Sequence, residues 1–171
     1  MHPQANDFIK SVKGKLPYFF SRQYVLECGS LNINGTARDF FTDCIYTGID
    51  LGEGKDVDVI CHAKDHLYPK SYGVVVSAEM LEHDKEWRES LLQMYANLDD
   101  NGLMLITCAS PLRAEHGTTE YGAHNSPFTN GYYHGLTTEE IAGVLTKEMF
   151  TDYFLDYGNE GKDVYFYGVK K

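Results

Sequence analysis

Two carboxylates, each at the end of a short apolar run, are the side chains of this sequence best suited to bind a ligand. Glu27 follows the apolar residues 24–26 and leads into a turn that begins at Gly29. Asp50 ends a second predicted strand, 46–50. A strand that ends in this way turns a carboxylate and backbone N–H groups toward one crevice, which suits a ligand rich in hydroxyl and amino donors. Two neighbouring strands that end in acids indicate a nucleoside-binding α/β fold.

Predicted strands and helices alternate along the chain, which is typical of a parallel sheet covered by helices. The strand at 72–77 is almost wholly apolar, as expected at the centre of such a sheet. The helix at 87–98 places Trp87, Leu91 and Met94 on one face. The predicted strands are 24–29, 46–50, 57–61, 72–77, 103–108, 150–157 and 164–169, and the predicted helices are 5–14, 35–42, 87–98 and 137–147.

Three connections shape the predicted sheet. Only six residues separate Asp50 from Val57, too few for an ordinary crossover helix. Thr137 and Glu140 form a capping box that starts the last helix. The last two strands flank the turn residues 158–161 and read as an antiparallel hairpin. The sheet is therefore predicted to be parallel apart from its final strand.

Composition limits the classes of protein to which the chain can belong. Its 171 residues carry 25 acids and 15 bases, a formal net charge of −10, which disfavours tight binding to a nucleic-acid backbone without excluding it. No apolar run reaches the roughly 20 residues of a membrane span, and the first residues do not resemble a secretion signal. The four cysteines have no CxxC spacing, so we predict reduced thiols and a cytoplasmic protein. Oligomeric state stays open.

The sequence from about Tyr24 to Leu145 resembles the class I S-adenosylmethionine-dependent methyltransferases, in particular small methyltransferase-domain proteins. Residues 27–38 match a motif of the form E-x-G-S-x-x-x-N-G-[ST]-x-R, and residues 77–83 match x-x-E-[VM]-[LI]-E-H. The resemblance implies a doubly wound, Rossmann-like α/β sheet of seven strands in the order 3-2-1-4-5-7-6. Strand 7 is antiparallel in this family. Because only six residues separate Asp50 from Val57, the helix between strands 2 and 3 is predicted to be shortened.

The resemblance also implies one methyltransferase domain over 1–171, with a lead-in helix inside 1–22, and S-adenosylmethionine as the cofactor, which leaves as S-adenosylhomocysteine. In the family, the acid at Asp50 binds both ribose hydroxyls, and the backbone at Ala63 or Lys64 meets adenine. The backbone near Ala78 lies against the methionine part. The predicted cofactor-binding residues are Glu27, Gly29, Ser30, Asn32, Gly35, Asp50, Leu51, Ala63, Lys64, Asp65, Ser77, Ala78 and Glu79.

Glu79, Glu82 and His83 carry atoms that ligate metals. Three oxygen and nitrogen donors near the start of a helix can hold a divalent cation, and in a few relatives, the small-RNA and quinone methyltransferases, this trio does so. In most of the family the segment is metal-free, with the residues matching Glu82 and His83 orienting loops. We therefore predict no metal and keep this trio as an open alternative.

A long segment without predicted helix or strand, 109–135, leaves the carboxyl end of the fifth strand. Unstructured stretches of this length in a compact domain are usually functional or disordered, and its aromatic and histidine content argues against disorder. We predict that it is the substrate lid, with Arg113 among its candidate functional residues. The candidate general bases are His83, His116 and His124, because the pKa of histidine suits proton transfer near neutral pH.

The resemblance implies an enzyme that moves the sulfonium methyl group to an oxygen, nitrogen or sulfur nucleophile by in-line displacement. We expect a small-molecule acceptor, which the sequence does not identify. The alternative function is a non-catalytic module that keeps the cofactor fold as a scaffold. A nicotinamide-dependent oxidoreductase is disfavoured, because no Gly-x-Gly-x-x-Gly follows the first strand.

Overall fold

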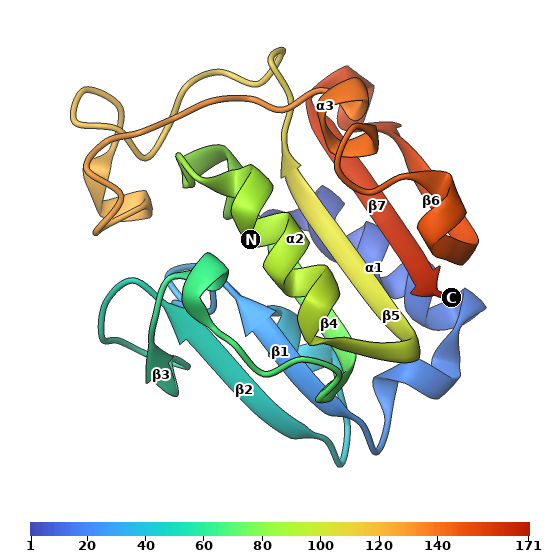
Figure 1. Ribbon diagram of the computed structural model, residues 1–171. Helices are drawn as coiled ribbons and strands as arrows, with labels where there is room; N and C mark the ends of the chain where they lie inside the picture. Colours follow the sequence, from blue (N-terminus) through green and yellow to red (C-terminus); the bar gives the residue numbers. More distant parts are fainter.

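Seven strands form one sheet, and their order is the predicted one. The computed structural model describes residues 1–171, and the strands lie in the order β3-β2-β1-β4-β5-β7-β6 (Figure 1). The first five strands pair in parallel, and β7 runs antiparallel between β5 and β6. The strands are β1 (Tyr24–Cys28), β2 (Ile45–Asp50), β3 (Val59–Ile60), β4 (Tyr72–Ala78), β5 (Leu98–Ala109), β6 (Phe150–Gly158) and β7 (Asp163–Lys170).

Alternating side chains of the central strands fill two cores, one on each face of the sheet. In β4, Val75 belongs to one core, whereas Val74 and Val76 belong to the other. Helix α2 (Trp87–Asn97) covers the first core and helix α1 (Pro3–Lys15) covers the second, each through buried apolar residues. Figure 1 shows α2 in front of the sheet and α1 behind it.

The connection between β1 and β2 differs from the prediction. The sequence predicted a helix over 35–42, but the structure has a single 3₁₀ turn, Ala37–Phe40. Helix α1 already covers this face of the sheet. The rings of Phe20 and Phe41 stack there with their centroids 4.9 Å apart and pack with the same core. A longer crossover helix would find little apolar surface left to cover.

The last helix begins where predicted and ends early. Helix α3 (Thr138–Ala142) starts at the predicted capping box, in which Thr137 and Glu140 each bond the other's backbone N–H. The prediction extended it through 147, but the helix stops at Gly143. Glycine has a low helix propensity, so it is a reasonable point for the helix to end.

The fifth strand begins earlier than the predicted 103–108. Leu98 already pairs with Tyr72, so β5 begins there. Pairing then resumes between Leu103 and Val74, which leaves extra residues on β5 and forms a bulge. Residues 99–102, between the predicted helix and the predicted strand, therefore belong to the strand.

The connection from β2 to β3 has no helix, as predicted. The third strand is shorter than the predicted 57–61, because the Asp58 side chain bonds other parts of the chain just before the strand begins. Its carboxylate accepts hydrogen bonds from the N–H of Gly48 (2.7 Å) and from Arg38 (2.6 Å). These bonds fasten the connection to β2 before the short strand begins.

The hairpin of β6 and β7 and the state of the cysteines agree with the predictions. The two strands pair antiparallel around the turn Asn159–Gly161. Cys28, Cys44, Cys61 and Cys108 are all free thiols. None of the helices combines the length and the apolar character needed to cross a lipid bilayer.

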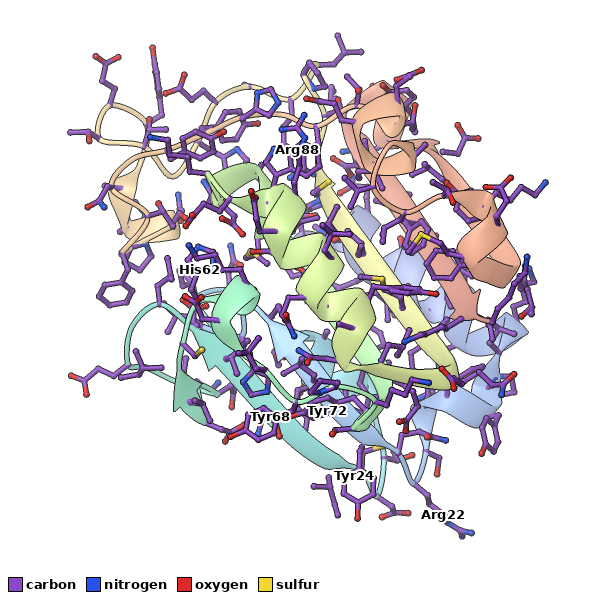
Figure 2. All side chains as sticks on the ribbon, viewed as in Figure 1. Arg22, Tyr24, His62, Tyr68, Tyr72 and Arg88 are labelled. Carbon is purple, nitrogen blue, oxygen red and sulfur yellow. The ribbon has the colours of Figure 1, made fainter.

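The parallel strands place their carboxyl ends at one edge of the sheet. Figure 2 shows Tyr24, at the start of β1, far from His62, which follows β3 at that edge. The chain between β5 and α3, residues 110–136, arches over the same edge in Figure 1 with only one 3₁₀ turn, Ala123–Asn125. We call 110–136 the covering segment.

Candidate active site

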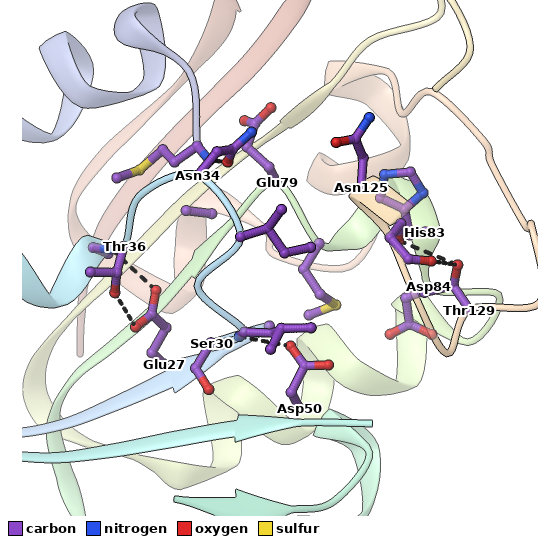
Figure 3. A pocket seen from close by; sticks show the side chains of 18 of the residues that line it. Glu27, Ser30, Asn34, Thr36, Asp50, Glu79, His83, Asp84, Asn125 and Thr129 are labelled. Carbon is purple, nitrogen blue, oxygen red and sulfur yellow. Dashed lines mark hydrogen bonds between the residues drawn. The ribbon is translucent and has the colours of Figure 1, made fainter. Parts of the chain in front are cut away.

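A cavity of about 500 Å³ lies at the carboxyl ends of β1, β2 and β4 (Figure 3). Its walls come from the turn after β1, the end of β2, the residues after β3 and β4, and the covering segment. Met1, His2 and Gln4 contribute as well. The volume lies within the usual range for sites that bind small molecules and cofactors.

Glu27 is buried at the end of β1 and organises the turn that follows. Its carboxylate accepts hydrogen bonds from the Tyr46 hydroxyl (2.8 Å), the Ala37 N–H (3.2 Å) and the Thr36 hydroxyl (3.3 Å). Figure 3 shows Glu27 beside Thr36. Burial raises the pKa of Glu27 to about 7, although these hydrogen bonds oppose the shift.

The raised pKa of Glu27 predicts a pH-dependent difference between the wild type and Glu27→Gln. The proton is held more tightly in the folded state, so the stabilisation is complete below the unfolded pKa of about 4.5 and is lost as pH rises through about 7. Between pH 5 and pH 8 the variant should gain about 2–3 kcal/mol in free energy of unfolding relative to the wild type. Urea denaturation at both pH values measures this difference, and a pH-independent difference would contradict the prediction.

Asp50 and Gly29 shape the centre of the cavity. The Asp50 carboxylate accepts the N–H of Leu31 (3.0 Å) and of Leu51 (2.7 Å), and Figure 3 shows it beside the turn after β1. Burial raises its pKa, against these backbone bonds. Gly29 has φ +81°, and a Cβ there would lie 2.5 Å from the Cβ of Met80, so glycine is required for this close approach.

Glu79 lies at the cavity wall just after β4 and belongs to a buried ion-pair cluster. Its carboxylate accepts a hydrogen bond from the Thr107 hydroxyl (2.8 Å) and forms ion pairs with Arg113 and His2. Arg113, from the covering segment, also pairs with Asp163, which is fully buried at the start of β7. Burial alone would raise the pKa of Glu79, but His2 and Arg113 lower it to about 2, so the carboxylate is charged.

His83 and His116 meet at the other side of the cavity, with Glu82 behind them. The two rings are nearly perpendicular, with centroids 5.1 Å apart, and both residues line the cavity. Burial lowers the pKa of His83 to about 4, so its imidazole is neutral. Glu82 is fully buried, and burial together with the charge of Glu79 raises its pKa to about 8.

Most of the predicted site residues surround this one cavity. The structure brings together two of the three candidate bases, His83 and His116, with residues from each predicted cofactor segment. The predicted cofactor-binding residues that line the cavity are Glu27, Gly29, Ser30, Gly35, Asp50, Leu51, Ala63, Ala78 and Glu79.

Five predicted site residues do not line the cavity: Asn32, Lys64, Asp65, Ser77 and His124. The Asn32 side chain turns away to Asp56 (2.6 Å), and Lys64 pairs with Glu86 (2.6 Å). Ser77 is completely buried within β4, and Asp65 and His124 are exposed.

Sequence reasoning missed several residues that line the cavity. His62 and Asp84 follow β3 and β4 by a few residues, so an inspection of every residue just after a parallel strand would have found them. Asn125 and Thr129 come from the covering segment, whose path no spacing predicts. Asp163 lies outside the cavity wall and acts through Arg113.

Searches for relatives by sequence found none: no known family profile and no curated protein matches the chain. Solved structures do resemble it. The 1,6-didemethyltoxoflavin-N1-methyltransferase of Burkholderia thailandensis, with 1,6-didemethyltoxoflavin and S-adenosylhomocysteine bound, aligns over 98% of this chain and 78% of its own, with TM-score 0.67 and 15% identity.

Two further structures show the same likeness. Phosphoethanolamine N-methyltransferase 2 of Haemonchus contortus, in complex with S-adenosyl-L-methionine, aligns over 96% of this chain and 52% of its own, with TM-score 0.66 and 17% identity. This chain thus spans about half of that protein. A SAM-dependent methyltransferase of Archaeoglobus fulgidus aligns over 97% and 94% of the two chains, with TM-score 0.63 and 16% identity. At these identities the likeness shows a common fold.

Proposed function

Since this chain has the fold of the class I S-adenosylmethionine-dependent methyltransferases, we propose that it binds S-adenosylmethionine in the cavity and methylates a small acceptor. The nucleophile is an oxygen, nitrogen or sulfur atom, and the protein works in the cytoplasm, where its free thiols stay reduced. Two structural neighbours carry S-adenosylmethionine or S-adenosylhomocysteine and are named for small acceptors, which supports both parts of the proposal.

The observation that carries the proposal is the placement of Asp50. Its carboxylate is fixed by the N–H groups of Leu31 and Leu51 at the wall of the cavity. A carboxylate has about four lone-pair positions, so it can also accept the two hydroxyls of a ribose. Gly29, just after β1, and Ala78, at the end of the adjacent β4, also line the cavity and leave room for the rest of the nucleoside.

The acceptor end of the cavity is assigned to His83 and His116. Both residues line the cavity, His83 from the turn after β4 and His116 from the predicted substrate lid. The cofactor supplies the reactive methyl carbon. The protein holds the nucleophile in line with the breaking C–S bond, and such positioning can contribute roughly 7–11 kcal/mol.

The covering segment is proposed as the substrate lid. It contributes Arg113, His116, Asn125 and Thr129 to the cavity wall and so closes the space above the carboxyl ends of the strands. Arg113 ties it to β4 and β7 through Glu79 and Asp163. The acceptor therefore meets residues of this segment rather than residues of the sheet.

A thermal-shift experiment with S-adenosylmethionine, S-adenosylhomocysteine and NAD tests the cofactor class. A ligand at about 100 times its dissociation constant stabilises the folded state by about 2.7 kcal/mol, several degrees for a domain of this size. We expect a shift with both sulfur nucleosides and none with NAD. No shift with either nucleoside contradicts the proposal, and binding without turnover on any acceptor panel favours the scaffold alternative.

A further inference from the structure

Three side chains that ligate metals meet beside the cavity, and the set is not the one considered from the sequence. Glu82 and His83 belong to the 3₁₀ turn Leu81–His83, and His116 comes from the covering segment. One donor atom from each of the three lies within 4.8 Å of the other two. A residue pair and a single histidine 33 positions later therefore form one cluster in space.

Glu82 needs a partner that the protein does not supply. The residue is fully buried, and neither carboxylate oxygen has a hydrogen-bond partner. A buried carboxyl group without a partner is costly, and natural proteins rarely keep one without a functional reason. Glu82 does not line the cavity, so an acceptor molecule does not reach it directly. A partner for this carboxylate must be small enough to fit between it and the two histidines.

Both histidines present the nitrogen that a metal requires. The Nδ1 of His83 lies 3.2 Å from the carbonyl oxygen of Tyr132, and the Nδ1 of His116 lies 3.1 Å from that of Ala114. A carbonyl oxygen can only accept, so each Nδ1 carries the proton. The Nε2 of each neutral ring then keeps a free lone pair. Backbone carbonyls hold metal-binding histidines in this way in many sites.

A glycine allows the two rings to come together. Gly117 has φ +68°, and a Cβ there would lie 2.7 Å from Cε1 of His83. Any other residue would be strained in this backbone conformation and would push the His83 ring away. The covering segment therefore carries a glycine where His116 must approach His83.

Glu79 does not belong to the cluster. Its carboxylate is taken by Arg113, Thr107 and His2, and its backbone has φ +61°. We propose that Glu82, His83 and His116 form a binding site for a divalent transition-metal ion. Two imidazoles and one carboxylate suit Zn²⁺, Fe²⁺, Co²⁺ or Mn²⁺ better than Mg²⁺ or Ca²⁺, which prefer oxygen ligands.

Three protein ligands leave coordination positions open. His83 and His116 line the cavity and Glu82 lies behind them, so the open positions face the acceptor end. A metal there would polarise a coordinated hydroxyl or thiol and favour its deprotonation. This role in turnover rests on the proposed methyl transfer, whereas metal binding does not.

The experiment uses the whole protein after EDTA treatment and desalting, with no cofactor or acceptor present. Calorimetry and thermal shift are recorded with ZnCl₂, CoCl₂, MnCl₂ and MgCl₂. We expect one transition ion to bind at one site per chain and to raise the melting temperature, with MgCl₂ much weaker. Glu82→Gln and His116→Ala should each weaken binding at least tenfold, since loss of only a supporting residue costs 10–100-fold.

His124→Ala is the matched control, because this exposed histidine lies on the same segment and outside the cluster. It should bind the ion as the wild type does. Absence of binding by every ion, equal binding by His116→Ala, or binding of Mg²⁺ as tight as that of Zn²⁺ overturns the proposal. Glu82→Gln also separates loss of binding from loss of folding. Since it removes a carboxyl group without a partner, the metal-free variant should be at least as stable as the metal-free wild type. Failure to bind S-adenosylmethionine leaves the metal result unaffected.

Discussion

Replacing Arg113 by alanine is expected to lower the free energy of unfolding by about 3–5 kcal/mol. The guanidinium lies between Glu79 and Asp163, and all three side chains are largely buried, Asp163 completely. The variant would leave two carboxylates in the interior, with only His2 nearby to compensate. An uncompensated buried charge is far more costly than a lost surface pair. Urea denaturation followed by circular dichroism measures the loss.

Arg88→Ala provides the comparison for that measurement. Arg88 is labelled in Figure 2 near the start of α2, its side chain is 58% exposed, and its nearest carboxylate, that of Glu140, is 3.8 Å away. An exposed pair of this kind contributes about 0–1 kcal/mol. If Arg113→Ala costs no more than Arg88→Ala, then the cluster around Arg113 does not stabilise the fold and the covering segment must be held by other contacts.

Asp50→Ala is expected to weaken binding of S-adenosylmethionine about 100-fold or more. The substitution removes both hydrogen bonds proposed for the ribose, and each bond to a charged group contributes about 1.5–3 kcal/mol. It also frees the N–H groups of Leu31 and Leu51, which the carboxylate now fixes. Titration calorimetry with S-adenosylmethionine and S-adenosylhomocysteine measures the effect.

The control for Asp50 is Asp39→Ala, which removes the same charge from an exposed position in the 3₁₀ turn Ala37–Phe40, outside the cavity wall. Its affinity should equal that of the wild type. Thermal denaturation of both variants separates loss of binding from loss of folding. A folded Asp50→Ala protein with unchanged affinity would refute the ribose assignment and leave the cavity without its proposed anchor.

The sheet was predictable because burial imposes a repeat on the sequence. Strand β4 is covered on both faces, so its side chains had to be mostly apolar, and residues 72–76 show this pattern. Strand order came from the family resemblance rather than from spacing. The helices were less predictable. Helix α1 covers a face that a helix between β1 and β2 would otherwise cover, and no local sequence pattern indicates which of the two segments does so.

The contents of the cavity were predictable where a residue lies at the carboxyl end of a parallel strand. Glu27, Asp50 and Ala78 are such residues. The pairings made by the covering segment were not predictable, because Arg113 belongs to an irregular connection and its partner Asp163 is 50 positions away, at the start of β7. The sequence predicted no metal and left Glu79, Glu82 and His83 as an open alternative, which differs from the cluster in the structure. The positive φ of Glu79 turns the chain there, so His116 takes the third place in the cluster.

The covering segment touches both ends of the cavity, and this has a kinetic consequence. Its base is closed by a hydrogen bond from the N–H of Leu136 to Ala109 (2.8 Å), and the Phe128 ring packs so tightly on Gly52 that a Cβ there would lie 2.4 Å away. Gly52 follows Asp50 by two residues, while His116 lies at the far end. On the proposed function, a nucleoside bound against Asp50 lies under this segment, so its exchange is expected to require movement of the segment. The residence time of the spent cofactor, rather than the displacement at carbon, is expected to set the turnover number.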